Sequence, residues 1–80
     1  MQLLPATYTE FLAVTASDST IINCRAIYVG GAGNLALSIS STASAVTFTG
    51  VAAGSVLPIQ LDQGRIMSTN TTATAIVALL

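Results

Sequence analysis

Charged side chains are the scarcest feature of this sequence. They make up 6% of its 80 residues, whereas about 25% is typical of soluble domains. The net charge of −1 gives little electrostatic repulsion between copies, so we expect the chain to associate. Two separated arginines and no lysine cannot neutralise several phosphates, so we expect no nucleic-acid partner.

Histidine is absent, and cysteine occurs once, as Cys24. A single cysteine cannot form an internal disulfide, and without histidine the usual metal ligands are missing, so we expect neither a metal nor another cofactor. A domain of this size has a marginal core and usually needs a disulfide, a metal or oligomerisation. Oligomerisation is the aid that remains. We expect Cys24 to be reduced and buried as a small apolar side chain.

Groups suited to catalysis are also lacking. The carboxylates of Glu10, Asp18 and Asp62 are far apart in the sequence, and a nucleophilic hydroxyl needs a neighbouring base that neither histidine nor lysine supplies here. The glycines of residues 30–33 resemble a phosphate-binding loop, but a strand and not a helix is expected to follow. We therefore predict no catalytic, cofactor-binding or metal residues and no enzymatic activity.

A long stretch without charge, residues 26–61, raises the question of a membrane partner. Glycines and Pro58 interrupt it and serines and threonines alternate through it, so no run approaches the roughly 20 apolar residues of a membrane-spanning helix. Residues 1–5 lack the basic and continuously apolar parts of a secretory signal. We expect synthesis in a cytoplasm and no membrane partner.

Short runs that alternate apolar and polar residues predict an all-β chain. The expected strands are 11–15, 25–29, 34–40, 46–49, 57–61, 65–69 and 74–80, with Ile21–Cys24 as a continuation or an edge. About seven short strands suit a small antiparallel β-sandwich or barrel. We expect one domain over residues 1–80, with residues 1–10 as an extended N-terminal arm.

Turn residues suggest how these strands connect. The glycine-rich residues 30–34 predict a hairpin between the strands on either side, with Leu35, Leu37 and Ile39 on the buried face of the second strand. Pro58 cannot donate a ladder hydrogen bond and predicts an edge strand or a bulge. Residues 62–64, Asp-Gln-Gly, predict a tight turn.

The last strand is apolar on both faces, which predicts burial in the core or against a neighbouring subunit. Tyr8 and the two arginines are further contact candidates, because tyrosine is enriched at interfaces and an arginine can pair with a carboxylate there. Either arginine can equally be an ordinary exposed side chain. The candidate subunit-interface residues are Tyr8, Arg25, Arg65, Val77, Leu79 and Leu80.

Several segments in the same order carry a family resemblance: residues 17–20, 24–34, 46–51, 53–59 and 71–79. Together they resemble the spike-base or capsid-decoration family of small β-rich structural proteins of tailed bacteriophages and gene transfer agents. The Asp-Gln-Gly of residues 62–64 departs from the more basic strand of that family.

The resemblance implies a virion structural protein on the outside of the head, made in the host cytoplasm. Such a protein acts as a decoration or cement protein that stabilises the shell, or as a head spike base that seats a fibre. Its partners would be the major capsid protein, a fibre protein and copies of itself. We expect a closed ring, a trimer before a pentamer, because closure hides strand edges.

Two other functions remain open at this stage. One is a tail or connector component, which the same composition would suit. The other is a carbohydrate-binding module for host attachment, which would favour exposed aromatic side chains beside acidic or amide groups.

Overall fold

The computed structural model describes residues 8–80, all of it strand and loop. The strands are β1 (Phe11–Val14), β2 (Ile22–Cys24), β3 (Ala26–Gly31), β4 (Gly33–Ser38), β5 (Val46–Val51), β6 (Ser55–Leu57), β7 (Leu61–Ile66) and β8 (Thr74–Leu79). Within this part of the chain no helix is long and apolar enough to cross a membrane. The predicted all-β class is confirmed, with one strand more than expected because β2 and β3 are separate.

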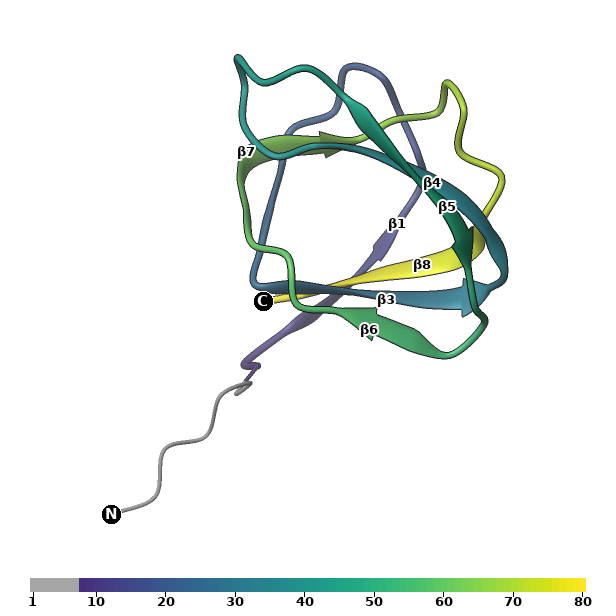
Figure 1. The fold of residues 1–80 in the computed structure, drawn as a ribbon. Coiled ribbons are helices and arrows are strands. Elements are labelled where there is room, and N and C mark those ends of the chain that lie inside the picture. Colours follow the sequence, from purple (N-terminus) through teal and green to yellow (C-terminus); the bar gives the residue numbers. More distant parts are fainter. Residues whose placement is uncertain (1–7) are drawn as a thin grey trace.

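Two four-stranded antiparallel sheets form the sandwich (Figure 1). Sheet 1 has the order β1-β8-β3-β6, and sheet 2 has the order β2-β7-β4-β5. This arrangement is that of an eight-stranded jelly roll, in which the chain passes repeatedly from one sheet to the other. Consequently β4 and β5 are the one pair of successive strands that lie side by side in the same sheet.

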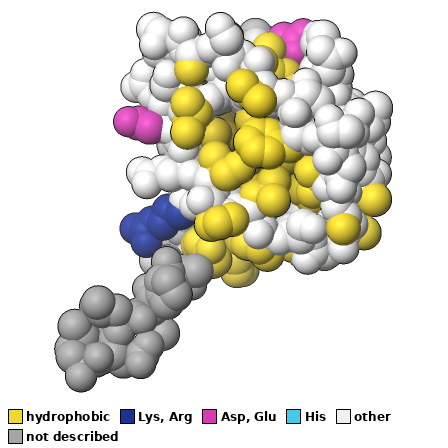
Figure 2. Space-filling view, viewed as in Figure 1, with side chains coloured by type: hydrophobic (Ala, Val, Ile, Leu, Met, Phe, Trp, Pro, Cys, Tyr) yellow, Lys and Arg dark blue, Asp and Glu magenta, His cyan; other side chains and the backbone are white. Residues whose placement is uncertain are grey.

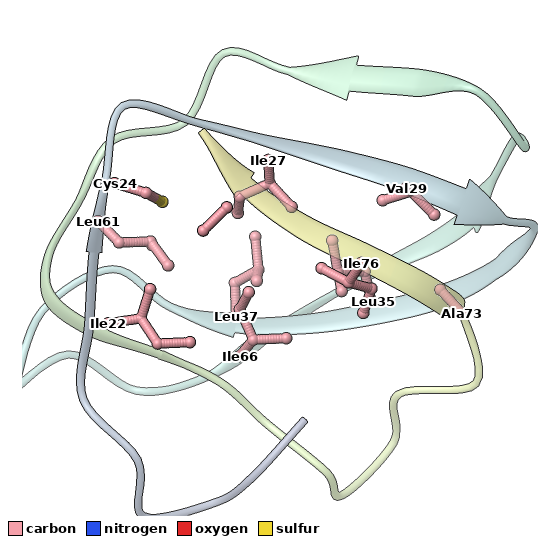
Figure 3. Close-up of a cluster of buried hydrophobic side chains, with 11 residues drawn as sticks. Ile22, Cys24, Ile27, Val29, Leu35, Leu37, Leu61, Ile66, Ala73 and Ile76 are labelled. Atoms are coloured by element: carbon pink, nitrogen blue, oxygen red, sulfur yellow. The ribbon is translucent and has the colours of Figure 1, made fainter. Parts of the chain in front are cut away.

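The core lies between the two sheets and is made of aliphatic side chains (Figure 3). Ile27 from sheet 1 and Leu35 from sheet 2 are fully buried at its centre, and their side chains point toward each other's sheet as strand alternation requires. The whole cluster is Ile22, Cys24, Ile27, Val29, Leu35, Leu37, Leu61, Ile66, Ala73, Ile76 and Ala78. One layer of side chains therefore holds the two sheets together.

The predicted hairpin over residues 30–34 is wrong. β3 pairs with β6 and β8, whereas β4 pairs with β5 and β7, so the chain crosses between the sheets at Ala32. The glycines are needed for close approach: a Cβ at Gly31 would overlap the Thr74 side chain, and one at Gly33 would lie 2.6 Å from the Ala73 nitrogen. The 72–74 segment thus packs directly against the crossing point.

The predicted turn at residues 62–64 is also wrong, because these residues lie inside β7. Ile22 pairs with Gly64 and Cys24 with Leu61, so β7 has one residue more than β2 over this interval, which is a β-bulge. Gln63 takes the positive φ of 57° at the bulge. Tight turns and β-bulges both favour residues that tolerate a positive φ, so the residue types alone do not distinguish them. The pairing of β7 with β2 shows that residues 62–64 form a bulge.

Further boundaries differ from the expected ones. β6 ends at Leu57 and β7 begins at Leu61, so Pro58 lies between two strands and not within one, although β6 is an edge strand as the proline predicted. β7 ends at Ile66 and does not extend to Thr69. Ile39, which was expected on the buried face, is exposed. Ser38, on the opposite side of the chain, is fully buried. The loop that follows covers it, and the Ser38 Oγ lies 2.7 Å from the carbonyl oxygen of Ser40 and 2.8 Å from that of Ala43.

The expected N-terminal arm falls partly within the described structure. Residues 1–7 lie outside the described residues. The next residues run beside the end of β8: the Thr9 N–H donates to the Leu80 carbonyl at 3.0 Å, and the Leu80 N–H donates to the Glu10 carbonyl at 2.8 Å. The chain therefore reaches β1 already paired with β8.

One carboxylate joins the β1–β2 loop to the β7–β8 loop, both of which connect the two sheets. Asp18 Oδ1 accepts the backbone N–H groups of Ser68 at 2.8 Å and Thr69 at 3.0 Å, and Oδ2 accepts the Thr69 hydroxyl at 2.5 Å. These hydrogen bonds, the one from the Thr69 hydroxyl first, lower the pKa of Asp18 below its ordinary value of 3.8. The ionised carboxylate thus stabilises the folded state.

We predict that Asp18→Asn lowers the melting temperature at neutral pH. The asparagine Nδ2 cannot accept the Thr69 hydroxyl. Because the pKa of Asp18 is lower in the folded than in the unfolded chain, its contribution is present above pH 3.8 and is lost as the pH falls through the folded pKa. Thermal melts from pH 7 downward should therefore show the two proteins converging in acid.

The control is Asp62→Asn, which removes the same charge from an exposed position in β7. Its melting temperature should stay closer to that of the unmodified chain at neutral pH. A difference for Asp18→Asn that is the same at every pH would contradict the role given to the carboxylate.

Candidate interaction surface

The outer face of sheet 1 is apolar from edge to edge. Ile27 and Ile76 belong to the core, so the residues that alternate with them along β3 and β8 point outward. The strand register places Ala13, Val77, Tyr28 and Val56 side by side in one row across all four strands. A second row places Phe11, Leu79 and Ala26 together. These residues form what we call the outer apolar face.

Exposure varies across the outer apolar face. Phe11 is 70% exposed, Val56 50% and Tyr28 36%, and Val77 is half-buried. Leu79 and Ala26, in contrast, are buried although they face outward. Monomeric soluble proteins rarely expose a continuous apolar area of this kind, and such areas mark sites of association.

The outer face of sheet 2 is polar. Thr47 pairs with Ala36 and Arg65 with Ser38, and all four lie on the side away from the core. Asn23 in β2 is exposed on the same side, where its Oδ1 accepts the Gln63 N–H at 2.7 Å. Ala36 and Ser38 are buried on this side, whereas Thr47 and Asn23 are exposed. The sandwich is thus amphipathic in its exposed side chains, which are mostly apolar on sheet 1 and polar at these positions of sheet 2.

A second apolar area lies where the sandwich is open between β5 and β6. Val46 and Phe48 pair with Leu37 and Leu35, so they are on the core-facing side of sheet 2, yet they are 60% and 39% exposed. Together with Ile59 and neighbouring residues they line a groove of about 210 Å³. Figure 2 shows hydrophobic side chains across this opening, which Figure 1 shows bounded by β5, β6 and the link to β7. We call it the β5 groove.

The structure brings some of the predicted interface residues together. Arg25 lies at the corner between β2 and β3, where its backbone N–H donates to the Leu79 carbonyl at 2.8 Å. Arg25 and Leu80 line a depression of about 410 Å³, with Glu10 and Asp62 among its other residues. Tyr8 precedes this region in the chain and is half-buried.

Other predicted residues lie elsewhere. Val77 is in the middle of the outer apolar face and pairs with Tyr28. Arg65 is on sheet 2, where its Nη2 donates to Ser38 Oγ at 3.3 Å, and its buried Nε has no hydrogen-bond partner among the described residues. The six residues therefore do not form one surface.

The sequence interpretation did not identify four exposed apolar residues of these surfaces: Phe11, Val46, Phe48 and Val56. Alternation correctly separates the two sides of each strand but does not reveal whether a side will be covered. The signal that could have found Phe11 and Val56 is an apolar residue on the outward side of several strands at once, which needs the strand order. Val46 and Phe48 face the core side, and their exposure follows from the shortness of β6 in the other sheet.

No chemical site accompanies these surfaces. Among residues 8–80 no three side chains of histidine, cysteine, aspartate or glutamate gather as metal ligands would. Cys24 is a free, buried thiol. Burial raises its pKa, and hydrogen bonds from the backbone of Leu61 and Ala26 oppose that rise. A buried thiol of raised pKa is a poor nucleophile.

We predict that Cys24 reacts with a thiol reagent such as dithionitrobenzoate much more slowly in the native protein than in denaturant, because the reactive thiolate is disfavoured and enclosed. Thr49→Cys, at an exposed position of β5, supplies a matched fast-reacting thiol in the same chain. Rapid titration of both thiols without denaturant would show that Cys24 is accessible and would contradict this prediction.

Comparison with solved structures found one clear similarity. The chain matches a chain in a structure described as "Capsid of native GTA particle computed with C5 symmetry", where GTA denotes a gene transfer agent. The TM-score is 0.80 with 33% sequence identity, and the match covers 99% of this chain and 92% of the other. No family model and no curated protein matches the chain.

Proposed function

Because the chain belongs to the same family as that small protein of the gene transfer agent capsid, and is therefore a capsid-associated structural protein of a virion, we propose that it decorates the outside of the head. In this role it acts as a cement protein that stabilises the shell or as a spike base that seats a fibre. The observation that carries the proposal is the near full-length match at 33% identity, and the amphipathic sandwich supports it.

We propose that the outer apolar face is the surface that binds the major capsid protein. Phe11, Tyr28 and Val56 are its exposed large side chains, and full burial of such a side chain contributes roughly 1.5–3 kcal/mol. The exposed polar side chains of sheet 2, such as Asn23 and Thr47, would then remain in water. The role is one of contact alone, so we propose that the protein is not an enzyme.

The protein is proposed to act as a homo-oligomer. Each subunit then contributes one low-affinity binding surface for the shell. Joining several such surfaces in one ring raises the avidity without any new contact. The trimer expected from the sequence has a competitor, because the related particle was computed with C5 symmetry. A fivefold ring is therefore the second stoichiometry to test.

The direct test is to locate the protein on intact particles by cryo-electron microscopy. Density for it on the outer surface of the head supports the proposal, and its symmetry axis gives the stoichiometry. Density confined to the tail or the connector would replace the proposal with the alternative that the protein is a component there. A fibre seated on it would identify a spike base.

We predict that Val56→Asp weakens binding to capsids that lack the protein by at least about tenfold, or about 1.4 kcal/mol. Val56 is half exposed, so the isolated chain should keep its melting temperature, whereas the new carboxylate would be desolvated at the capsid-binding surface. Co-sedimentation with the capsids measures the binding.

The matched control is Asn23→Asp on the outer face of sheet 2. It adds the same charge and keeps an oxygen that can accept the Gln63 N–H. It should bind capsids as the unmodified chain does. Equal loss of binding by both variants would mean that the added charge itself matters, and not the outer apolar face.

A further inference from the structure

The four edge strands of the sandwich differ in how they are protected against pairing with another chain. β2 and β6 have three residues each, and Pro58 follows β6 directly. β5 has six residues, Val-Thr-Phe-Thr-Gly-Val, and is exposed over the first five. It carries none of the charges or prolines that protect natural edge strands. β1, the fourth edge, also lacks charges and prolines but has four residues. β5 is thus the longest edge without such protection, with one β-bulge between Phe48 and Val51.

The β5 groove lies along the same edge. Val46 and Phe48 point into it from β5, and Ile39 and Ile59 line it from the adjoining loops. Its volume of about 210 Å³ is below the roughly 300–1,000 Å³ of small-molecule sites. Such a groove beside a free strand edge suits an extended peptide that adds a strand and inserts one apolar side chain.

Residues 1–7, Met-Gln-Leu-Leu-Pro-Ala-Thr, have the composition of such a peptide. They carry no charged side chain, and two leucines stand next to each other. Fully extended, seven residues span roughly 24 Å, which is longer than β5. In a strand one of the two leucines would point to the groove, because neighbouring side chains alternate.

The position of this segment favours a neighbouring copy as the recipient. The chain from Tyr8 enters at β1, and β1 and β6 are opposite edges of sheet 1. Three strand spacings, roughly 14 Å, separate them, so a segment with a reach of roughly 24 Å would use most of its length to arrive at its own β5 groove and would have little left to pair along β5. Pairing of β5 with β5 of a second copy would be isologous and would stop at a dimer. Insertion of a segment into the next copy is heterologous, and such a contact forms a ring when the rotation between successive copies closes.

We propose that residues 1–7 of one copy occupy the β5 groove of the next and pair with the free edge of β5. The exchange deepens the proposed function, because it supplies the contact that links the subunits of the decorating ring. It also covers the edge and the apolar groove that a single chain leaves exposed. The capsid-binding surface on the outer apolar face is separate, so the two proposals can fail independently.

Disulfide trapping tests the exchange in the purified protein. Val46→Cys is combined with either Leu3→Cys or Leu4→Cys, in a Cys24→Ala background so that the introduced thiols alone can pair. The expected result on mild oxidation is a ladder of covalent oligomers, in one of the two combinations, on non-reducing gels. The control replaces Val46→Cys with Thr47→Cys, whose side chain faces away from the groove, and should give few cross-links.

Other outcomes overturn the proposal. A monomer with an internal disulfide would show that the segment folds back into its own groove. Absence of cross-links in both combinations would leave the groove to another partner, such as the major capsid protein. Cross-linking remains informative even if the protein proves not to bind the head, since it is measured without capsids.

A second measurement does not depend on disulfide geometry. Val46→Lys places a charge in the β5 groove at a residue that is 60% exposed, whereas Thr47→Lys places the same charge on the polar side of the same strand. Removal of residues 1–7 and Val46→Lys should both lower the native mass from the ring to the monomer, and Thr47→Lys should not. An unchanged ring in the first two variants would overturn the exchange.

Discussion

The fold depends on a single layer of aliphatic side chains packed between two small sheets. Each sheet has four strands, so this layer is narrow, and every core residue is within two strands of an edge. A larger sandwich could enclose Phe48 and Val46 between its sheets. Here they face the core and remain exposed, because β6, the edge strand of the other sheet, has only three residues. This geometry supports the proposed assembly as much as the composition does.

Hydrogen bonds of hydroxyl and amide groups join segments of this chain that ion pairs would join in more charged domains. Asn34 accepts the N–H groups of Thr72 and Ala73 on its carbonyl and that of Gly50 on its Oδ1, and its own N–H donates to the Thr72 hydroxyl. Three segments are thus joined around one uncharged residue. Because such hydrogen bonds are not screened by salt as surface charges are, the fold should tolerate wide changes of ionic strength.

The sequence predicted the strands well where alternation is local and failed where the answer lies in distant pairing. The apolar run of β8 and the alternation of β4 were identified within about two residues. The crossing at Ala32 was mistaken for a hairpin, because glycine serves equally in a turn and beside a closely packed segment, and only the position of Thr74 distinguishes the two. Of the outer apolar face the sequence predicted only Val77 and Leu79 as contact residues for the same reason, since β1, β3, β6 and β8 are neighbours in space and far apart in the chain.

The strand order also has a consequence for how the chain reaches this structure. β4 and β5 form the one hairpin between successive strands, and every other pairing must close a much longer loop. Chains dominated by such non-local pairings fold in milliseconds to seconds, slowly for their size. The earliest piece of native structure is therefore expected to be the hairpin that bears the exposed edge. A newly made chain would expose the unpaired edge of β5 before the rest of the sandwich has formed. Because β5 carries no charge, this edge would be open to pairing with other chains during that time.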